Sequence, residues 1–249
     1  MKVSIITIAW NSAETIEATI QSVLAQKYPD IEYIIIDGAS TDDTMKIVKK
    51  YEKDIAKVVS EPDKGIYDAM NKGVQHATGE LVGILNSDDF YADENVVTDI
   101  VNRLLESHAD GIYADLVYVD RDNPDKVIRY WKAKEYHKGD FLKGWMPPHP
   151  TFFVRKCKYD AWGTYSLELR SAADYELMLR FIHKNGLKLS YLPRVITRMR
   201  VGGESNVSLK SRIRANKEDR MAWTMNGLKP APFTLIRKPL SKVGQFLMK

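Results

Sequence analysis

Polar and aromatic residues follow each of several short apolar segments in the first ninety positions of the chain. Trp10 and Asn11 follow the first segment, Asp37 the second, and Asp63 and Lys64 the third. Each group alone is what an ordinary turn contains. If the apolar segments are parallel strands, however, their carboxyl ends meet at one edge of a sheet, where such sheets bind ligands. The sequence therefore predicts a ligand site built from several loops.

The most acidic of these loops contains Asn86, Ser87, Asp88 and Asp89. The chain has no G-x-G-x-x-G and no G-x-x-x-x-G-K-[ST] sequence, so neither type of glycine-rich phosphate loop is present. Carboxylates that face a phosphorylated ligand need a divalent cation between them, because like charges repel. We therefore expect the acidic loops to recruit a hard divalent cation such as Mg²⁺ or Mn²⁺. An aromatic ring such as Trp10 can stack on a nucleobase, so the predicted ligand is a metal-bound nucleoside diphosphate.

The elements that must position these loops follow from the hydrophobic pattern. Short apolar segments at 3–9, 32–36, 56–60 and 81–85 predict buried strands. Helical periods follow between and after them, ending with an apolar stripe over 96–105. Alternating strands and helices are typical of repeated βαβ units, so the predicted fold class is α/β with a mostly parallel central sheet flanked by helices.

The pattern is less regular from about residue 111 onward. In chain order it predicts strands over 112–119 and 127–131, a loop over 139–150, a helix over 173–184, strands over 187–192 and 195–201, and a basic helix over 210–226. We therefore divide the chain into a regular first half, 1–110, a smaller second half of the same domain, 111–209, and a basic helical tail, 210–249.

Composition excludes several classes of protein. With 44% hydrophobic and 28% charged residues among 249, the chain has the composition of a globular protein. The only cysteine, Cys157, closes no intramolecular disulfide, and the five histidines lack a zinc-binding spacing. No apolar run approaches the roughly 18 residues of a membrane span, so we expect a cytoplasmic protein without a signal peptide.

Four motifs carry a family resemblance. Residues 4–11, 37–44, 79–80 and 85–89 resemble, in order and spacing, the motifs of family 2 glycosyltransferases with the GT-A fold, over roughly 3–205. The resemblance implies transfer of a sugar from a nucleoside diphosphate donor to a hydroxyl of a glycan or lipid-linked acceptor. It makes 1–110 the nucleotide-sugar-binding half and 111–209 the acceptor-binding and catalytic-base half. It also implies inversion, a D-x-D metal site and a carboxylate base, and a place in bacterial surface polysaccharide synthesis.

On the donor side, the resemblance places Trp10 beside the nucleobase, with Asn11 next to it, and Asp37 in the acidic turn that contacts base or ribose. Gly38 stands where the family commonly has a second acid, so uridine and guanosine both stay open, with a UDP-sugar favoured. Asp63 and Lys64 are the expected nucleotide contacts of the next loop, the alternative being solvated charges at a helix start.

The D-x-D motif has an amide at its first position, Asn86. This residue is expected to reach the ribose or a metal-bound water, and Ser87 to contact the nucleotide. Asp88 is then the expected leading metal ligand beside the donor phosphates, which suits Mg²⁺ or Mn²⁺. Asp89 is expected to assist it or to cap the following turn.

On the acceptor side, the resemblance makes Asp174 the catalytic base, although an aspartate at a helix start is also a common N-cap. Trp145 and His149 lie in the loop that the family uses for the acceptor, and a structural histidine is the alternative for His149. The family's metal-facing histidine is absent near Arg200. A guanidinium there is expected to hold the leaving diphosphate, or else to form a strand-end salt bridge.

Residues 210–249 hold ten Lys and Arg against two acids, whereas the rest of the chain has a net charge of −4. The interleaved apolar residues favour a solvated helix that caps the core or a peripheral contact with the inner face of an anionic membrane. No nucleic-acid partner is expected, because no nucleic-acid-binding motif accompanies the basic residues.

Two other functions are compatible with parts of the sequence. A non-catalytic nucleotide-sugar-binding or assembly module is suggested by Asn86, Gly38 and Ala173, which stand where acids are common in the family. A nucleotidyltransferase is disfavoured, because residues 1–20 contain no Gly or Arg for a phosphate loop.

Overall fold

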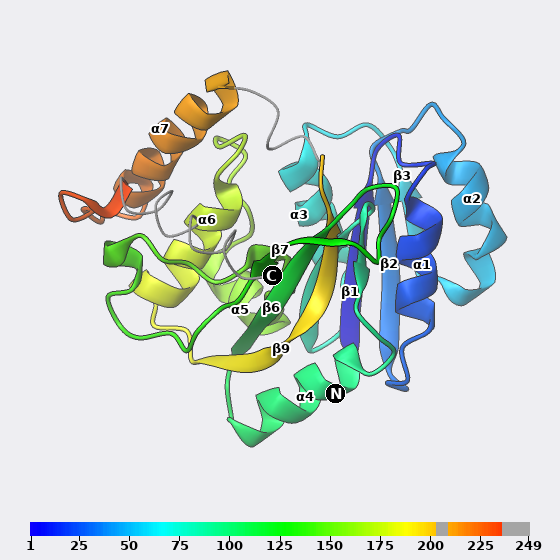
Figure 1. Ribbon diagram of the computed structural model, residues 1–249, viewed down its shortest axis with the longest axis horizontal. Helices are drawn as coiled ribbons and strands as arrows, with labels where there is room; N and C mark the ends of the chain where they lie inside the picture. Colours follow the sequence, from blue (N-terminus) through cyan, green and yellow to red (C-terminus); the bar gives the residue numbers. More distant parts are fainter. Residues whose placement is uncertain (203–208, 236–249) are drawn as a thin grey trace.

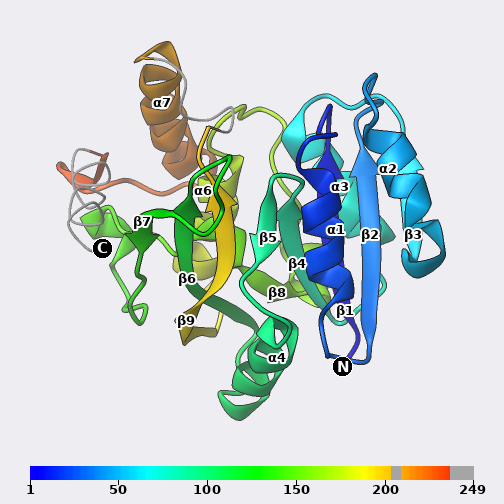
Figure 2. The same cartoon turned by 45° about the vertical axis from the view of Figure 1, so that its right-hand side comes forward.

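The computed structural model describes residues 1–202 and 209–235. A single mixed sheet runs through these residues in the order β3-β2-β1-β4-β8-β6-β9-β5, and β7 pairs with β6 beside this path (Figures 1 and 2). The sheet is parallel on one side and mostly antiparallel on the other. The predicted α/β class is confirmed.

The parallel side consists of the four strands that the sequence predicts. They are β1 (Val3–Ala9), β2 (Ile31–Asp37), β3 (Lys57–Ser60) and β4 (Leu81–Asn86). β1 lies between β2 and β4, and Val3 is in register with both Ile31 and Leu81. The carboxyl ends of β1, β2 and β4 therefore lie side by side.

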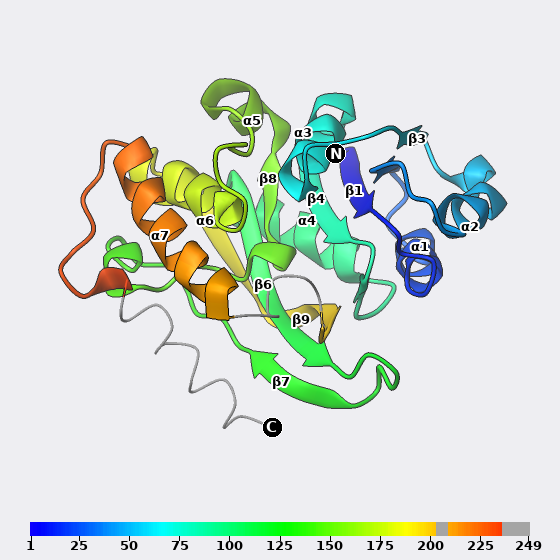
Figure 3. The ribbon, with the colours of Figure 1, turned by 90° about the horizontal axis from the view of Figure 1, so that it is seen from above.

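Both faces of this sheet are apolar. Successive residues of a strand point to opposite faces, and the apolar residues of each strand are therefore shared between two cores. Ile6 and Ile8 of β1 pack in a core with α3 (Ile66–His76), whereas Val3 and Ile5 pack in a second core on the opposite face. The helices of the second core are α1 (Ile16–Leu24), α2 (Thr44–Lys50) and α4 (Val96–Glu106). Figure 3 shows α3 and α5 on one side of the sheet, with α1 and α4 on the other.

The second half of the chain adds β5 (Asp89–Tyr91), β6 (Gly111–Val119), β7 (Val127–Trp131), β8 (Phe153–Arg155) and β9 (Leu189–Arg200). The short strands β5 and β8 were not predicted. β8 joins the two sides of the sheet, because it pairs antiparallel with both β4 and β6. It packs so closely that a Cβ at Gly83 would lie 2.1 Å from Phe153 Cε1.

The two strands predicted over 187–192 and 195–201 form one strand, β9, so the predicted break is wrong. Pro193 lies inside β9, where the pairing with β6 shifts register between Ala114 and Leu116. Such an irregularity accommodates a residue that cannot donate a ladder hydrogen bond. The sheet continues past the proline to Arg200.

Helices complete the core beside the antiparallel strands. They are α5 (Lys156–Trp162), α6 (Ala173–Met178) and α7 (Leu209–Met225), with a π-helical turn over Leu179–Lys184 that continues α6 and confirms the predicted helix 173–184. Three 3₁₀ turns, η1 (Glu52–Asp54), η2 (Phe141–Lys143) and η3 (His149–Thr151), lie in the connections. α7 packs on α6, and Trp223 Nε1 donates to Tyr175 Oη at 2.9 Å. The rest of the predicted tail, 236–249, lies outside the described residues.

Candidate active site

The loops after β1 and β2 are bound to each other at the carboxyl edge of the sheet. The backbone N–H of Asn11 donates to Ser40 Oγ at 2.8 Å, and the Asn11 side-chain oxygen accepts from the backbone N–H of Thr41 at 2.9 Å. Asn11 adopts a left-handed conformation, with φ of 48°, which asparagine tolerates better than most residues. Its side chain therefore fixes the loop that carries its neighbour Trp10.

Trp10 and Asp63, both predicted nucleotide contacts, lie together over Gly38. A Cβ at Gly38 would lie 2.4 Å from Asp63 Oδ2 and 3.4 Å from Trp10 Cδ1. The absence of a side chain at position 38 therefore lets the carboxylate approach the indole. The Trp10 side chain is 61% exposed, so its ring is available for stacking. Lys64 is also exposed, and its backbone N–H donates to Asp68 Oδ2.

Asp37 and Ser87 are buried and take part in hydrogen bonds within the protein. Asp37 accepts from the Ser40 backbone N–H at 3.0 Å, from Ser40 Oγ at 2.5 Å and from Ser60 Oγ at 2.6 Å. Ser87 Oγ shares a hydrogen bond of 2.7 Å with Ser12 Oγ. These contacts give both side chains a role in holding the loops, and their contact with a nucleotide stays a prediction.

The acidic loop after β4 places two carboxylates in surroundings that do not favour their charge. Asp89 is fully buried and accepts from Asn86 Nδ2 at 3.3 Å, while its Oδ1 has no hydrogen-bond partner in the described part of the chain. Burial and the neighbouring Asp88 charge raise the pKa of Asp89 well above its usual value. Burial also raises the pKa of Asp88, against the opposing charges of Arg200 and Arg121.

Arg200, at the end of β9, closes this acidic loop. Its Nη1 donates to the Asp88 backbone oxygen at 2.7 Å, and its Cζ lies 4.7 Å from the centre of the Phe90 ring. Burial lowers the pKa of Arg200, while the charges of Asp89 and Asp88 oppose that shift. β5 pairs with β9 and brings the two segments together, with Asp89 in register with Met199.

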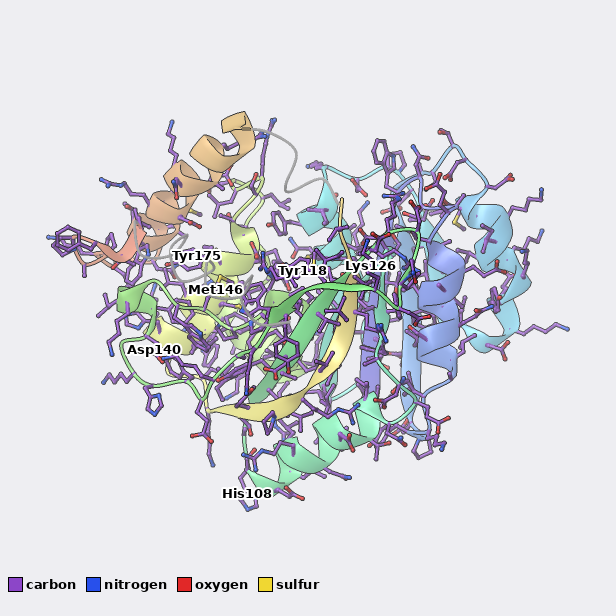
Figure 4. All side chains as sticks on the ribbon, in the orientation of Figure 1. His108, Tyr118, Lys126, Asp140, Met146 and Tyr175 are labelled. Carbon is purple, nitrogen blue, oxygen red and sulfur yellow. The ribbon has the colours of Figure 1, made fainter. Side chains whose placement is uncertain are left out.

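The antiparallel ribbon of β6 and β7 also contributes residues near the acidic loop. Figure 4 shows Tyr118 and Lys126 on this ribbon, far from His108, which lies beyond α4. Arg129 of β7 lies over the Tyr118 ring, with its Cζ 4.2 Å from the ring centre. The turn between these strands also carries Arg121, whose charge acts on Asp88. Sequence reasoning did not single out Arg121, because a turn arginine has no local pattern that distinguishes it.

The donor set fits a divalent cation that is held mainly by a substrate. Within residues 1–202 and 209–235, no group of three or more His, Cys, Asp or Glu side chains could enclose a metal ion. Mg²⁺ and Mn²⁺ commonly take one or two protein carboxylates and complete their coordination with water and phosphate oxygens. Asp88, which is partly buried, and Asp89, whose Oδ1 has no partner among the described residues, are the two carboxylates of this loop that would hold such a cation.

Asp174 lies in a second polar centre, with partners from two other segments. Tyr67 Oη donates to Asp174 Oδ1 at 3.1 Å, and His149 Nδ1 lies 3.2 Å from Asp174 Oδ2. The N-cap of α6 is Ala172, and no side-chain hydrogen bond caps the helix, so the capping alternative for Asp174 is wrong. Sequence reasoning did not single out Tyr67, although it lies in the motif-like stretch that follows Asp63.

Trp145 packs in an aromatic cluster rather than directly against Asp174. Its ring stacks on Tyr136 at 6.4 Å between centroids and meets the edge of Tyr113 at 6.0 Å, and Lys134 Nζ lies 5.2 Å from it. Trp145 is half-buried, so its contact with an acceptor stays a prediction.

The mixed sheet, with an acidic loop at the end of β4 and a second carboxylate on α6, defines a GT-A glycosyltransferase fold. The family model described as glycosyl transferase family 2 matches residues 4–161. The chain belongs to this family.

Two relatives from Mycobacterium tuberculosis illustrate the similarity. The chain is 36% identical over 180 residues to the uncharacterized glycosyltransferase Rv1514c, covering 72% of this chain and 68% of that protein. It is 28% identical over 207 residues to the PGL/p-HBAD biosynthesis glycosyltransferase Rv2957, covering 82% and 78%. A shorter match, 43% identical over 90 residues, links 35% of the chain to 36% of the putative teichuronic acid biosynthesis glycosyltransferase TuaG of Bacillus subtilis.

Solved structures share the fold at lower identity. S. aureus TarS 1–349 in complex with UDP-GlcNAc superposes with a TM-score of 0.69 at 20% identity, over 91% of this chain and 65% of TarS 1–349. The mannosyltransferase PcManGT from Pyrobaculum calidifontis, in complex with GDP-Man and Mn²⁺, superposes with a TM-score of 0.70 at 20% identity, over 98% and 70%. No helix of the described residues has both the length and the apolar character needed to cross a bilayer.

Proposed function

We propose that this protein transfers a sugar, with inversion, from a nucleoside diphosphate donor to a hydroxyl of a glycan or lipid-linked acceptor. The observation that carries the proposal is the pair of polar centres: Asp88 with Arg200 after β4, and Asp174 with His149 on α6. The names of relatives in teichuronic acid and PGL biosynthesis support a role in bacterial surface polysaccharide synthesis. The UDP-GlcNAc and GDP-Man bound in the similar structures support a nucleotide-sugar donor.

On the donor side, Trp10 stacks on the base and Asp63 contacts it, next to the space that Gly38 leaves open. Asp88 and Asp89 would hold a divalent cation, Mg²⁺ or Mn²⁺, beside the donor diphosphate. These residues would thereby place a positive charge that offsets the negative charge developing on the leaving diphosphate. Arg200 is held next to Asp88 and adds a fixed positive charge on the same side.

On the acceptor side, Asp174 takes the proton from the attacking hydroxyl as its oxygen forms a bond to the anomeric carbon. The bond between that carbon and the diphosphate breaks on the opposite face, so the configuration inverts. His149, 3.2 Å from Asp174 Oδ2, donates a hydrogen bond to the acceptor sugar, and Trp145 contributes an apolar surface beside it.

A panel of donors tests the donor site. UDP, GDP, CDP and dTDP are added with and without Mn²⁺, and thermal stability is measured; we expect one base to give a shift that Mn²⁺ enhances. Asp88→Asn is expected to abolish the Mn²⁺ enhancement, while the exposed Asp54→Asn leaves it unchanged. An equal Mn²⁺ enhancement in Asp88→Asn would contradict the metal assignment.

A transfer assay with the responding donor separates an enzyme from a binding module. Sugar transfer to a panel of glycan and lipid-linked acceptors, with an inverted anomeric configuration by NMR, is the expected result. Tight donor binding without transfer to any acceptor would favour the alternative, a non-catalytic nucleotide-sugar-binding or assembly module, for which Asn86 in place of an acid is the motivation.

A peripheral contact with an anionic membrane is proposed for α7, with the protein at the inner face of the cytoplasmic membrane. The two acids of this helix, Glu218 and Asp219, are both buried, whereas Arg214, Lys217 and Arg220 are exposed. The exposed charge of this part of α7 is therefore basic, which attracts a surface rich in anionic lipid.

Vesicle sedimentation tests this contact. Binding to vesicles with anionic lipid, and none to neutral vesicles, is expected of the full chain. Replacing the three exposed basic residues of α7 by Gln should weaken it strongly, whereas a matched triple change of Lys46, Lys49 and Lys53 on α2 and η1 should not. Equal losses in the two triple variants would contradict a specific role of α7.

A further inference from the structure

Helix α3 connects the donor loop with the base. The donor-side residues Asp63 and Lys64 precede Gly65, the N-cap of α3, and Tyr67 lies in the first turn of the helix. Tyr67 Oη donates to Asp174 Oδ1 at 3.1 Å, a contact between residues 107 positions apart. Burial and the Asp174 charge raise the pKa of Tyr67 far above its usual value, so the phenol keeps its proton and remains a donor.

A second set of contacts on the same face of α3 holds the loop that leads into α6. Asn71, one turn after Tyr67, donates from Nδ2 to the Tyr165 backbone oxygen at 2.8 Å and accepts from the Tyr165 N–H at 2.8 Å. The Tyr67 ring stacks on the Tyr165 ring at 5.8 Å between centroids and 17° between planes. The phenol of Tyr67 is therefore held firmly by its surroundings.

The two oxygens of Asp174 face different partners. Oδ1 faces Tyr67, which is on the buried side, and Oδ2 faces His149, whose side chain is 36% exposed against 19% for Asp174. A carboxylate with one oxygen fixed by a rigid donor has its other oxygen fixed in direction as well. The direction of Oδ2 decides whether it meets the hydroxyl of a bound acceptor.

We propose that Tyr67 is a positioning residue for the catalytic base: its hydroxyl fixes Asp174 Oδ1 so that Oδ2 faces the acceptor. The proposal rests on the proposed function, because it assigns a role relative to the base at Asp174. It also makes α3 a direct connection between the loop that contacts the donor and the group that deprotonates the acceptor.

Tyr67→Phe tests the role, because it removes the hydroxyl and keeps the stacked ring. We expect kcat to fall by about 10-fold while the donor KM changes less than about 2-fold, since the donor contacts stay intact. The acid limb of the kcat–pH profile should move to higher pH, because a hydrogen bond to a carboxylate stabilises its ionised form. Titratable groups that face this carboxylate include Tyr67 from α3, His149 from η3 and Tyr165 from the preceding loop.

A matched control is Tyr191→Phe. Tyr191 Oη donates to the buried Asp115 at 2.8 Å, so this change also removes a phenol–carboxylate hydrogen bond, but in β9 and β6. We expect it to lower thermal stability and to leave kcat and the pH profile unchanged.

Three results would overturn the proposal. One is an unchanged kcat and pH profile in Tyr67→Phe, and another is a kcat loss of equal size in Tyr191→Phe. The third is loss of the Mn²⁺-dependent donor response in Tyr67→Phe, which would assign Tyr67 to the donor site instead. A wild-type protein that transfers no sugar to any acceptor would refute the proposed function itself, and this result is distinct because it does not depend on the variants.

Discussion

Each end of the parallel sheet holds a buried carboxylate. The two carboxylates differ in their hydrogen-bond donors and in the direction of their pKa shifts. At the amino end, burial alone would raise the pKa of Glu32, but hydrogen bonds from Ser4, Thr78 and Lys2 lower it to about 2. At the carboxyl end, Asp89 accepts from Asn86, its Oδ1 has no partner within the described residues, and its pKa is raised well above normal.

The difference separates a structural carboxylate from one that is suited to bind a ligand. Glu32 has enough donors to compensate for its desolvation, so its charge stabilises the fold. Asp89 has fewer such donors, and its Oδ1 has none among the described residues, so its charge is costly until a cation or another positive group approaches. A buried charge that destabilises the fold is retained where it serves function, because a functional site can require groups that lower stability.

Asp174 is intermediate, because it accepts from the neutral Tyr67 hydroxyl and lies beside the His149 imidazole. Its removal is expected to have the largest effect on activity. Asp174→Asn should lower the transfer rate by about 10²- to 10⁴-fold, the usual contribution of a general base. Donor binding, measured by the Mn²⁺-dependent thermal shift, should stay within about 2-fold because the donor site is elsewhere. Transfer at the wild-type rate would exclude Asp174 as the base.

The sequence predicts the parallel half of the fold well, because its physical signals are local. Each of the four strands is an apolar segment bounded by polar residues, and the alternation of helices and strands leaves little choice of topology. The three-residue strands β5 and β8 are too short to show a period. By local rules, Pro193 predicts a break in the strand. The chain pairs with β6 on both sides of the proline, however, and this pairing outweighs the local preference.

The residues of the candidate site also divide into those whose position the sequence predicts and those whose contacts it does not. Residues that directly follow predicted strands, such as Asp88 and Trp10, could be placed at the sheet edge from spacing. The contacts of Tyr67 with Asp174 and of Arg200 with Asp88 join positions more than a hundred residues apart, and no spacing rule reaches so far. The buried hydrogen bonds of Asp37 were also not predictable, since an Asp-Gly turn looks the same whether it binds a ligand or its own loop.

Glu32→Gln should lower the stability of the fold without affecting activity. Because the pKa of Glu32 is lowered to about 2, its ionised form stabilises the fold above pH ~4.5, and this stabilisation is lost as the pH falls toward 2. At pH 7 the variant should lose about 2 kcal/mol of unfolding free energy, measured by urea denaturation, with kcat unchanged. The exposed Glu52→Gln is the control, and a loss of kcat in Glu32→Gln at full stability would contradict a purely structural role.

Asp89→Asn should change stability in the opposite direction. Its pKa is raised in the folded state, so the ionised carboxylate destabilises the fold as the pH rises above its ordinary value of 3.8. The amide has almost the same shape and removes the buried charge, so we expect a gain of about 1 kcal/mol at pH 7, shrinking toward pH 4, by urea denaturation. The same variant should weaken the Mn²⁺-dependent donor response, because one oxygen ligand is lost. If Asp89→Asn were destabilising at pH 7, Asp89 would be a supported structural carboxylate like Glu32, and the contrast between the two ends of the sheet would not hold.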